Sequence, residues 1–232
     1  MTVSAHGRVH NAGMLPPFDE LAGAADPRLD LLALSLAAAF RDVDAERALS
    51  SLDALAAEVG ATAGGPDADG DAQVAACVEV LARRHGFAGD AERYDDPDNS
   101  MLDLVLDRRR GLPILLSVVY IEVARRAGIA LAGVGLPGHF VVAHLGRRAT
   151  VLLDPFARGA PVDRHVPGPL VRAWPATEIA MRMLNNLVGS FRRRGNVGAA
   201  IRAASMRLAL PADPPLRGSL ERELRSLQAT LN

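Results

Sequence analysis

The chain has 232 residues, of which 49% are hydrophobic and 23% charged, a balance that predicts one or two globular domains and excludes wholesale disorder. The net charge of −1 does not support a nucleic-acid-coating or membrane-surface role, so we expect neither nucleic acid nor membrane as a partner. All 26 basic residues are arginine, which excludes a Schiff-base or P-loop lysine, and the single cysteine, Cys77, excludes an intramolecular disulfide.

The start of the chain carries no recognisable targeting segment. Residues 1–15 lack the apolar core of a secretory signal, and glycine and proline interrupt residues 1–17. The longest apolar runs, 31–40 and 113–121, reach only about half the length of a membrane span. We therefore expect a soluble, cytoplasmic protein whose residues 1–28 form a flexible N-terminus.

Apolar residues at helical spacing dominate the first half of the chain. They predict three helices, over residues 29–40, 44–60 and 71–85. A further helix is predicted to begin near Ser100, because Ser100 and Asp103 have the spacing of a capping box. Gly111 follows that helix, and Pro113 suits the first turn of the next one because its missing N–H is not needed there.

Residues 114–127 are mostly apolar and predict a helix enclosed by the core, which Gly128 ends. A helix with so few polar positions cannot lie at the surface. We therefore expect buried side chains at Leu115, Leu116, Val118, Val119 and Val123, and also at Cys77 on its own apolar helix face.

The hydrophobic period changes from 3.6 to 2 after Gly128. Three short strands are predicted over residues 129–136, 139–145 and 149–153, with turns at Pro137-Gly138 and Gly146-Arg147. After a loop to about residue 175, helices are predicted over residues 177–194, 197–210 and 215–231. The predicted fold class is therefore α+β, with helices packed on a small antiparallel sheet and a helical tail.

His139 and Asp154 form the most informative pair of polar residues. His139 begins one predicted strand and Asp154 follows the next, so a tight turn brings the two side chains together. A carboxylate beside an imidazole fixes the tautomer of the imidazole and stabilises its cation, as hydrolases and acyl transferases require. The alternative is a structural hydrogen bond at the end of a sheet.

Two other residues could supply a nucleophile for His139. Cys77 lies on an apolar helix stripe, where a free cysteine usually behaves as a small buried hydrophobe. Ser117, the one serine in the apolar helix, could instead bond to a carbonyl one turn earlier. The aspartate clusters at 67–71 and 95–98 fit turns and helix caps, and the histidine spacing matches no zinc motif, so we expect no metal and no cofactor.

Five short motifs occur in order between Tyr94 and Phe156. They are Tyr-Asp-Asp-Pro-Asp-Asn-Ser at 94–100, Val-Leu-Asp-Arg-Arg-Arg-Gly-Leu-Pro at 105–113, Tyr-Ile-Glu-Val-Ala-Arg-Arg-Ala-Gly at 120–128, Pro-Gly-His-Phe at 137–140 and Leu-Asp-Pro-Phe at 153–156. This series resembles the bacterial SirB-type proteins, a transglutaminase-like family that is often followed by tetratricopeptide repeats.

The resemblance implies a papain-like core, in which a helix with a nucleophilic cysteine at its N-terminus packs on a sheet that carries His and then Asp. His139 and Asp154 match those two residues. The cysteine position falls on Pro113, which has no nucleophilic group, and SirB-type proteins commonly lack this cysteine. The resemblance therefore implies a transglutaminase-like domain over residues 29–175 without transglutaminase or protease activity.

The tail over residues 176–232 resembles the repeat part of the family in outline. Its small and apolar residues have roughly the spacing of one tetratricopeptide unit: Leu184, Leu187, Phe191, Ala200 and Ala204. A solenoid needs about three repeats, and the tail has room for about one and a half, so we expect the tail to pack on the core domain.

Three hypotheses for the function follow. In the first, a non-catalytic transglutaminase-like protein binds a protein or peptide partner around the vestigial pair of His139 and Asp154, in a regulatory role. In the second, a hydrolase or acyl transferase uses Ser117 or Cys77 with that pair. In the third, the domain is structural and a partner docks on the helical tail. The oligomeric state does not follow from the sequence.

Overall fold

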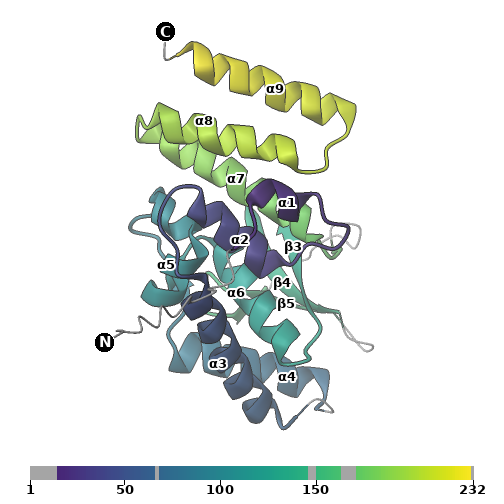
Figure 1. Ribbon diagram of the computed structural model, residues 1–232. Coiled ribbons are helices and arrows are strands. Elements are labelled where there is room, and N and C mark those ends of the chain that lie inside the picture. The colour runs from purple at the N-terminus through teal and green to yellow at the C-terminus, as the bar shows by residue number, and fades with distance from the viewer. Residues whose placement is uncertain (1–14, 66–67, 146–149, 163–170, 231–232) are drawn as a thin grey trace, which may run out of the picture.

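Helices pack against a small antiparallel sheet. The computed structural model describes residues 15–65, 68–145, 150–162 and 171–230 (Figure 1). The expected α+β class is confirmed: helices pack on a small sheet, and helical segments lie at both ends of the described chain.

The elements follow one another in blocks along the chain. The helical block contains α1 (Phe18–Ala22), α2 (Leu29–Ala38), α3 (Ala45–Ala63), α4 (Gly70–Cys77), the π-helical segment η1 (Val78–Arg84), the 3₁₀ turn η2 (Pro97–Ser100), α5 (Leu102–Arg108) and α6 (Pro113–Arg126). The main sheet contains β3 (Leu131–Leu136), β4 (His139–Leu145), β5 (Thr150–Asp154) and β6 (Ala160–Pro161). The tail contains α7 (Ala176–Arg193), α8 (Val197–Met206), the 3₁₀ turn η4 (Arg207–Ala209) and α9 (Pro214–Ala229).

Two local expectations about helix ends were wrong. Helix α3 continues to Ala63, because Gly60 is tolerated inside it and Gly64 supplies the left-handed C-cap at φ 88°. The capping box at Ser100 is not formed, because residues 97–100 form the turn η2 and α5 begins only at Leu102. The buried Ser100 hydroxyl has no hydrogen-bond partner within the described part of the chain.

The described part of the N-terminal segment is packed on α2. Phe18 and Ala22 of α1 are buried, and Ser35 Oγ of α2 donates a hydrogen bond to the Pro16 carbonyl at 2.9 Å. The sequence pattern did not predict α1. Residues 1–14, which include Gly7 and Gly13, lie outside the described residues.

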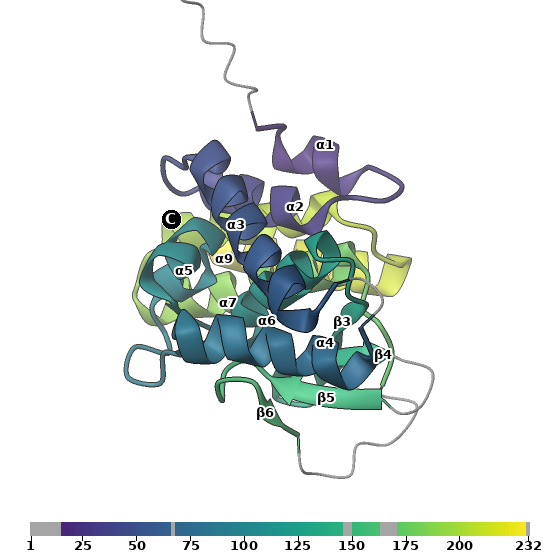
Figure 2. The same cartoon turned by 90° about the horizontal axis from the view of Figure 1, so that it is seen from below.

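Helix α6 lies at the centre of the core. Pro113 is its first residue, as expected, and α6 lies between α3 and the sheet strands β3 and β4 (Figure 2). The prediction of burial is confirmed for all six side chains, each of which is 0% exposed: Leu115, Leu116, Val118, Val119, Val123 and Cys77.

The main sheet has the strand order β3-β4-β5-β6, and all neighbours are antiparallel. Its first three strands correspond to the predicted ones, and the predicted turn at Gly146-Arg147 lies outside the described residues. The edge strand β6 was not predicted. Neither was the two-residue parallel pair of β1 (Ala88–Gly89) and β2 (Arg110–Gly111).

Alternate residues of β4 belong to two different apolar clusters. Phe140 and Val142 belong to the main core together with α6. Val141 and Ala143 belong to a smaller cluster with residues of β3. Because side chains alternate along a strand, the smaller cluster lies on the face of the sheet opposite to α6.

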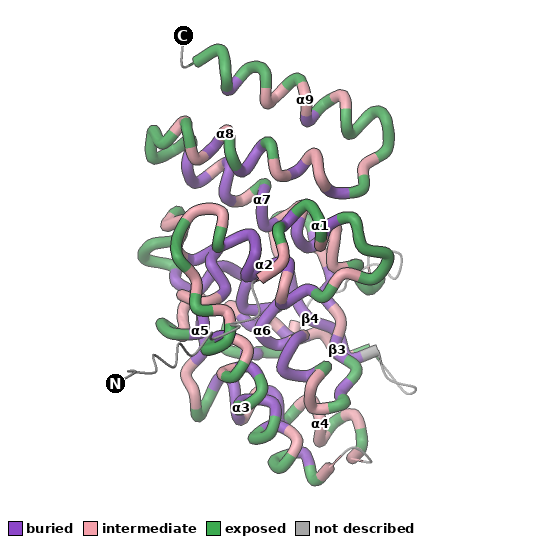
Figure 3. The backbone as a smooth tube through the Cα atoms, in the orientation of Figure 1, coloured by how far each residue is buried: buried purple, intermediate pink, exposed green. Residues whose placement is uncertain are grey.

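The tail is a stack of helices that extends away from the core (Figure 1). Helix α7 packs against α2 and α6, α8 packs against α7, and α9 packs against α8. Burial decreases in that order, and Figure 3 shows that α9 is mostly exposed whereas α6, in the centre of the molecule, is mostly buried. None of the helices formed by the described residues is long and apolar enough to cross a membrane.

Candidate functional site

His139 and Asp154 meet at one end of the antiparallel sheet. His139 Nε2 lies 2.7 Å from Asp154 Oδ2, so the expected pairing is confirmed. The strand register explains it. Val142 pairs with Leu153, which places Val141 opposite Asp154. His139 lies two residues from Val141 and therefore shares its face of the sheet.

Further hydrogen bonds hold both members of the pair. Oδ1 of Asp154 accepts hydrogen bonds from the backbone N–H groups of Phe156 at 3.0 Å and Ala157 at 3.3 Å. The turn after β5 therefore orients the carboxylate. On the other side, Arg182 of α7 donates from Nη2 to the His139 carbonyl at 2.8 Å, which anchors the first residue of β4.

The pair is accessible from solvent. The side chains of His139 and Asp154 are 26% and 20% exposed. Phe156 packs edge-on against Tyr94, with 6.0 Å between the ring centroids, and Tyr94 is 46% exposed. We call these four residues the His139 surface: the polar pair of His139 and Asp154, and the aromatic pair of Phe156 and Tyr94.

The helix position at which the resemblance places a nucleophile contains Pro113. Ser117, one turn later, is fully buried, and its Oγ donates a hydrogen bond to the Pro113 carbonyl at 2.8 Å. The structural interpretation of Ser117 is therefore confirmed. Within the described residues, Ser117 Oγ makes no hydrogen bond with His139.

Cys77 is also enclosed. It is fully buried in the main core, on the α6 side of the sheet, whereas His139 shares the opposite face with Val141. Burial raises the pKa of the Cys77 thiol to about 12. A fully buried, neutral thiol packs as a small core side chain.

Tyr120 of α6 lies close to both Cys77 and Asp154. Its hydroxyl is buried, without a hydrogen-bond partner in the described part of the chain. Burial raises the pKa of Tyr120, and the nearby Cys77 and Asp154 raise it further. The Tyr120 phenol therefore stays protonated at neutral pH and does not act as a base.

Cys77 should resist alkylation in the folded protein. Because the thiolate reacts and the pKa is about 12, its thiolate fraction at pH 8 is roughly a thousandfold below that of a free cysteine. Mass spectrometry should detect iodoacetamide labelling that is slow in buffer and fast in urea. Equal labelling rates under both conditions would show that the thiol is accessible.

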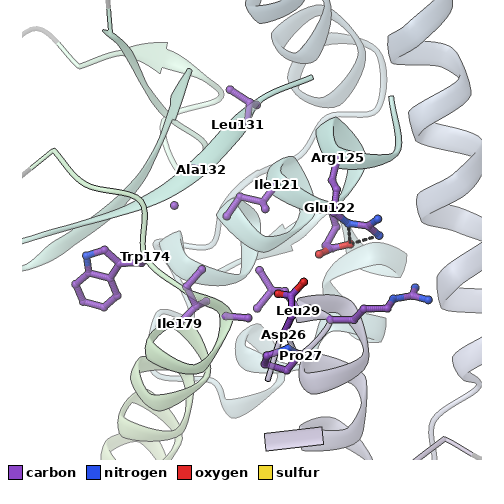
Figure 4. A pocket seen from close by; sticks show the side chains of 13 residues that line it. Asp26, Pro27, Leu29, Ile121, Glu122, Arg125, Leu131, Ala132, Trp174 and Ile179 are labelled. Carbon is purple, nitrogen blue, oxygen red and sulfur yellow. Dashed lines mark hydrogen bonds and ion pairs between the residues drawn. The ribbon is translucent and has the colours of Figure 1, made fainter. Parts of the chain in front are cut away.

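A buried ion network lies at the C-terminal half of α6. Asp30 and Glu122 are 0% and 2% exposed, and Arg126 contacts both carboxylates, at 2.5 Å and 2.6 Å. Burial alone would raise the pKa of Asp30, but hydrogen bonds from Arg28 and Arg126 outweigh it and lower the pKa. Figure 4 shows the adjoining cavity of about 330 Å³, with the ion pair of Glu122 and Arg125 at its edge. The network ties α2 to α6.

The lowered pKa of Asp30 makes part of the stability depend on pH. A carboxylate with a lowered folded-state pKa adds stability above its unfolded pKa, about 3.9, and loses it as the pH falls through the folded-state pKa. Asp30→Asn removes that contribution. In urea unfolding at a series of pH values, the variant should therefore lose less stability than the wild type below about pH 4; parallel curves would contradict this.

Arg182 and the ion network are features that the sequence patterns above did not identify. Glu122 inside an apolar helix, with Arg126 four residues later, is a signal that could have indicated a buried pair. No local pattern predicts that Arg182 contacts His139, 43 residues away.

The site contains a histidine–carboxylate pair, and neither Ser117 nor Cys77 is hydrogen-bonded to it among the described residues. His139 can exchange a proton or bind a polar group, with Asp154 fixing its tautomer. Among the residues that the structure describes, no group of three or more His, Cys, Asp or Glu side chains is placed to hold a metal ion.

Comparison with known proteins identifies relatives over most of the chain. A family model described as Transglutaminase-like superfamily matches residues 46–186. A UPF0162 protein of Xylella fastidiosa (strain 9a5c) is 32% identical over 227 residues, which cover 87% of this chain and 79% of the relative. A UPF0162 protein of Vibrio cholerae is 26% identical over 184 residues, 71% of this chain and 68% of the relative.

The similarity also reaches a eukaryotic protein. F-box only protein 21 of Mus musculus is 29% identical over 133 residues, which cover 50% of this chain and 21% of that protein. No solved structure matches the chain. His139 and Asp154 both lie within residues 46–186, which the family model matches.

Proposed function

Because the chain belongs to the transglutaminase-like superfamily, we propose that it is a non-catalytic member that binds a protein or peptide partner in a regulatory role. The observation that carries this proposal is Pro113 at the start of α6. A thiolate at a helix N-terminus is stabilised by the helix dipole, and proline leaves that position without any nucleophilic atom.

The two replacement nucleophiles do not support catalysis. Ser117 is bonded to the Pro113 carbonyl, and Cys77 is buried with its pKa raised to about 12. The His139 surface, in contrast, remains accessible. A site that keeps its polar pair and loses its nucleophile fits ligand binding better than turnover.

A second candidate function is hydrolysis or acyl transfer by Ser117 or Cys77 with His139 and Asp154. The intact contact of 2.7 Å between His139 and Asp154 favours it. It would require His139 to reach a nucleophile, and a candidate base must lie within about 3.2 Å of that atom, directly or after a small rearrangement. The position of His139 on the sheet face opposite to the main core speaks against it.

The proposal also covers the closer family and the domain boundaries. We propose kinship with the SirB-type proteins, a transglutaminase-like domain over residues 29–175 and a helical domain over residues 176–232 that is similar to tetratricopeptide repeats. The stacking of α8 on α7 and of α9 on α8 supports the repeat-like tail. The packing of α7 on α2 and α6 supports the expectation that this tail rests on the core.

The proposal is tested by affinity purification from the native cell with the full chain as bait. His139→Ala should lose the specific partner. His85→Ala is the matched control, because His85 also pairs with a carboxylate, Glu58 at 2.9 Å, and is similarly exposed at 25%. A partner that is retained by His139→Ala, or lost equally by both variants, would place binding away from the His139 surface.

A further inference from the structure

A groove along α7 has one apolar wall and contains an arginine with no carboxylate partner among the residues that the structure describes. It has a volume of about 470 Å³. Its floor is one face of α7, from Thr177 to Asn186, and Pro211 and Leu216 line the opposite side. Trp174, just before the start of α7, also lines the groove. The volume falls in the range of ligand-binding pockets, about 300–1,000 Å³.

Arg182 occupies the middle of this floor and is not neutralised. Its guanidinium lies 5.4 Å from the ring centroid of Phe140 and 5.7 Å from that of Trp174. Its hydrogen-bond acceptors are neutral carbonyls, of His139 at 2.8 Å and Leu136 at 3.5 Å. No carboxylate of the described residues pairs with it.

The partial burial of Arg182 strengthens its preference for an anion. Burial lowers the pKa of Arg182, because the charged form loses solvation beside the two aromatic rings. Two of the five N–H groups of the guanidinium are used, so three remain for a ligand. A planar guanidinium of this kind is suited to bidentate binding of a carboxylate.

The other groups of the groove limit the charge of the ligand. Glu178 forms an ion pair with Arg172 at 2.6 Å, and Arg172 lies over the Trp174 ring. Glu178 and Arg172 neutralise one another, so that end of the groove offers no unpaired cation to a second negative charge. At the other wall, Leu216 is one of two large apolar side chains that are strongly exposed among the described residues. These features favour an apolar ligand with one negative charge.

The position of Arg182 indicates an internal segment of a chain rather than a chain end. The lining residues of α7 span about 13 Å at 1.5 Å per residue, the length of about four extended residues. Arg182 lies near the middle, with lining residues on both sides. A terminal carboxylate bound there would leave half of the groove empty.

We propose that the groove binds an extended apolar segment of a partner protein that carries one acidic side chain at its centre, bound by Arg182. This inference rests on the proposed binding role and gives it a ligand chemistry and a location. Since Arg182 also bonds to the His139 carbonyl, occupation of the groove is connected directly to the first residue of β4.

The test is selection of a random heptapeptide library on the full chain, followed by titration of the consensus peptide. Trp174 is the only tryptophan of the chain and lines the groove, so its fluorescence reports binding. We expect a consensus with one Asp or Glu between apolar residues. Replacing that acid by its amide, or Arg182 by Gln, should weaken binding about ten- to a hundredfold.

Two further variants make the result specific. Leu216→Ser removes an exposed wall residue, does not touch the Arg182 contacts, and should also weaken binding. Arg202→Gln is the matched control, because Arg202 likewise lies over an aromatic ring, Phe40, and donates to a backbone carbonyl, and it should leave the Kd unchanged.

Three results would refute peptide binding in the groove. They are a consensus without an acidic residue, the absence of any enriched peptide, and binding that Arg182→Gln and Leu216→Ser leave unchanged. Peptides that bind independently of the groove but are lost with His139→Ala would refute the groove and leave the proposed function standing. Turnover of a bound peptide would instead refute the proposed function.

Discussion

Replacing Arg126 with methionine should lower the free energy of unfolding by about 3–5 kcal/mol. The Arg126 side chain is 10% exposed and contacts two buried carboxylates, Asp30 and Glu122, as well as Asp53 at 2.7 Å. Methionine keeps most of the apolar stem but removes the arginine that lies closest to both buried carboxylates, leaving Asp30 with Arg28 and Glu122 with Arg125. Urea unfolding followed by circular dichroism measures the loss.

An exposed arginine provides the comparison. Arg84 pairs with Glu79 at 3.2 Å, and its side chain is 50% exposed. Exposed ion pairs contribute about 0–1 kcal/mol, so Arg84→Met should change stability by no more than that. Equal losses for the two variants would mean that the network around Arg126 contributes no more than a surface ion pair.

Truncation of Leu116 should have a similarly large effect. Its side chain is 0% exposed in the centre of α6, between α3 and the sheet. Leu→Ala in a closely packed core costs about 2–5 kcal/mol, because apolar contacts are lost and a cavity remains. The same substitution at Leu216, which is 41% exposed, should change stability by about 0.5 kcal/mol or less. A loss below about 0.5 kcal/mol at Leu116 would show that α6 is peripheral.

Periodicity predicted those elements whose signals are local. Helix α6 and the first three strands of the main sheet lie close to their predicted ranges, because an apolar helix and an alternating strand each carry their own pattern. The end of α3 could not be predicted from glycine alone. Gly60 and Gly64 are both plausible stops, and only the backbone conformation at Gly64 shows which one ends the helix.

In the candidate site, too, local patterns predicted some contacts and only the folded structure shows others. The contact of His139 with Asp154 was predictable, because one antiparallel register brings both to the same face. The role of Arg182 was not, because it depends on how α7 packs against a strand 43 residues earlier. Tertiary packing, rather than any local pattern, also decided that Cys77 is enclosed in the main core, whereas Val141, which shares a strand face with His139, belongs to the smaller cluster.

The central claim is that this transglutaminase-like chain performs no acyl transfer. The most direct measurement is product formation by the full chain from a glutamine-containing peptide with an amine acceptor and from an activated ester, followed by mass spectrometry. We predict rates equal to those without protein, and no change with Ser117→Ala, Cys77→Ala or His139→Ala. Turnover that Ser117→Ala or Cys77→Ala abolishes would contradict the account and establish a catalytic member of the superfamily.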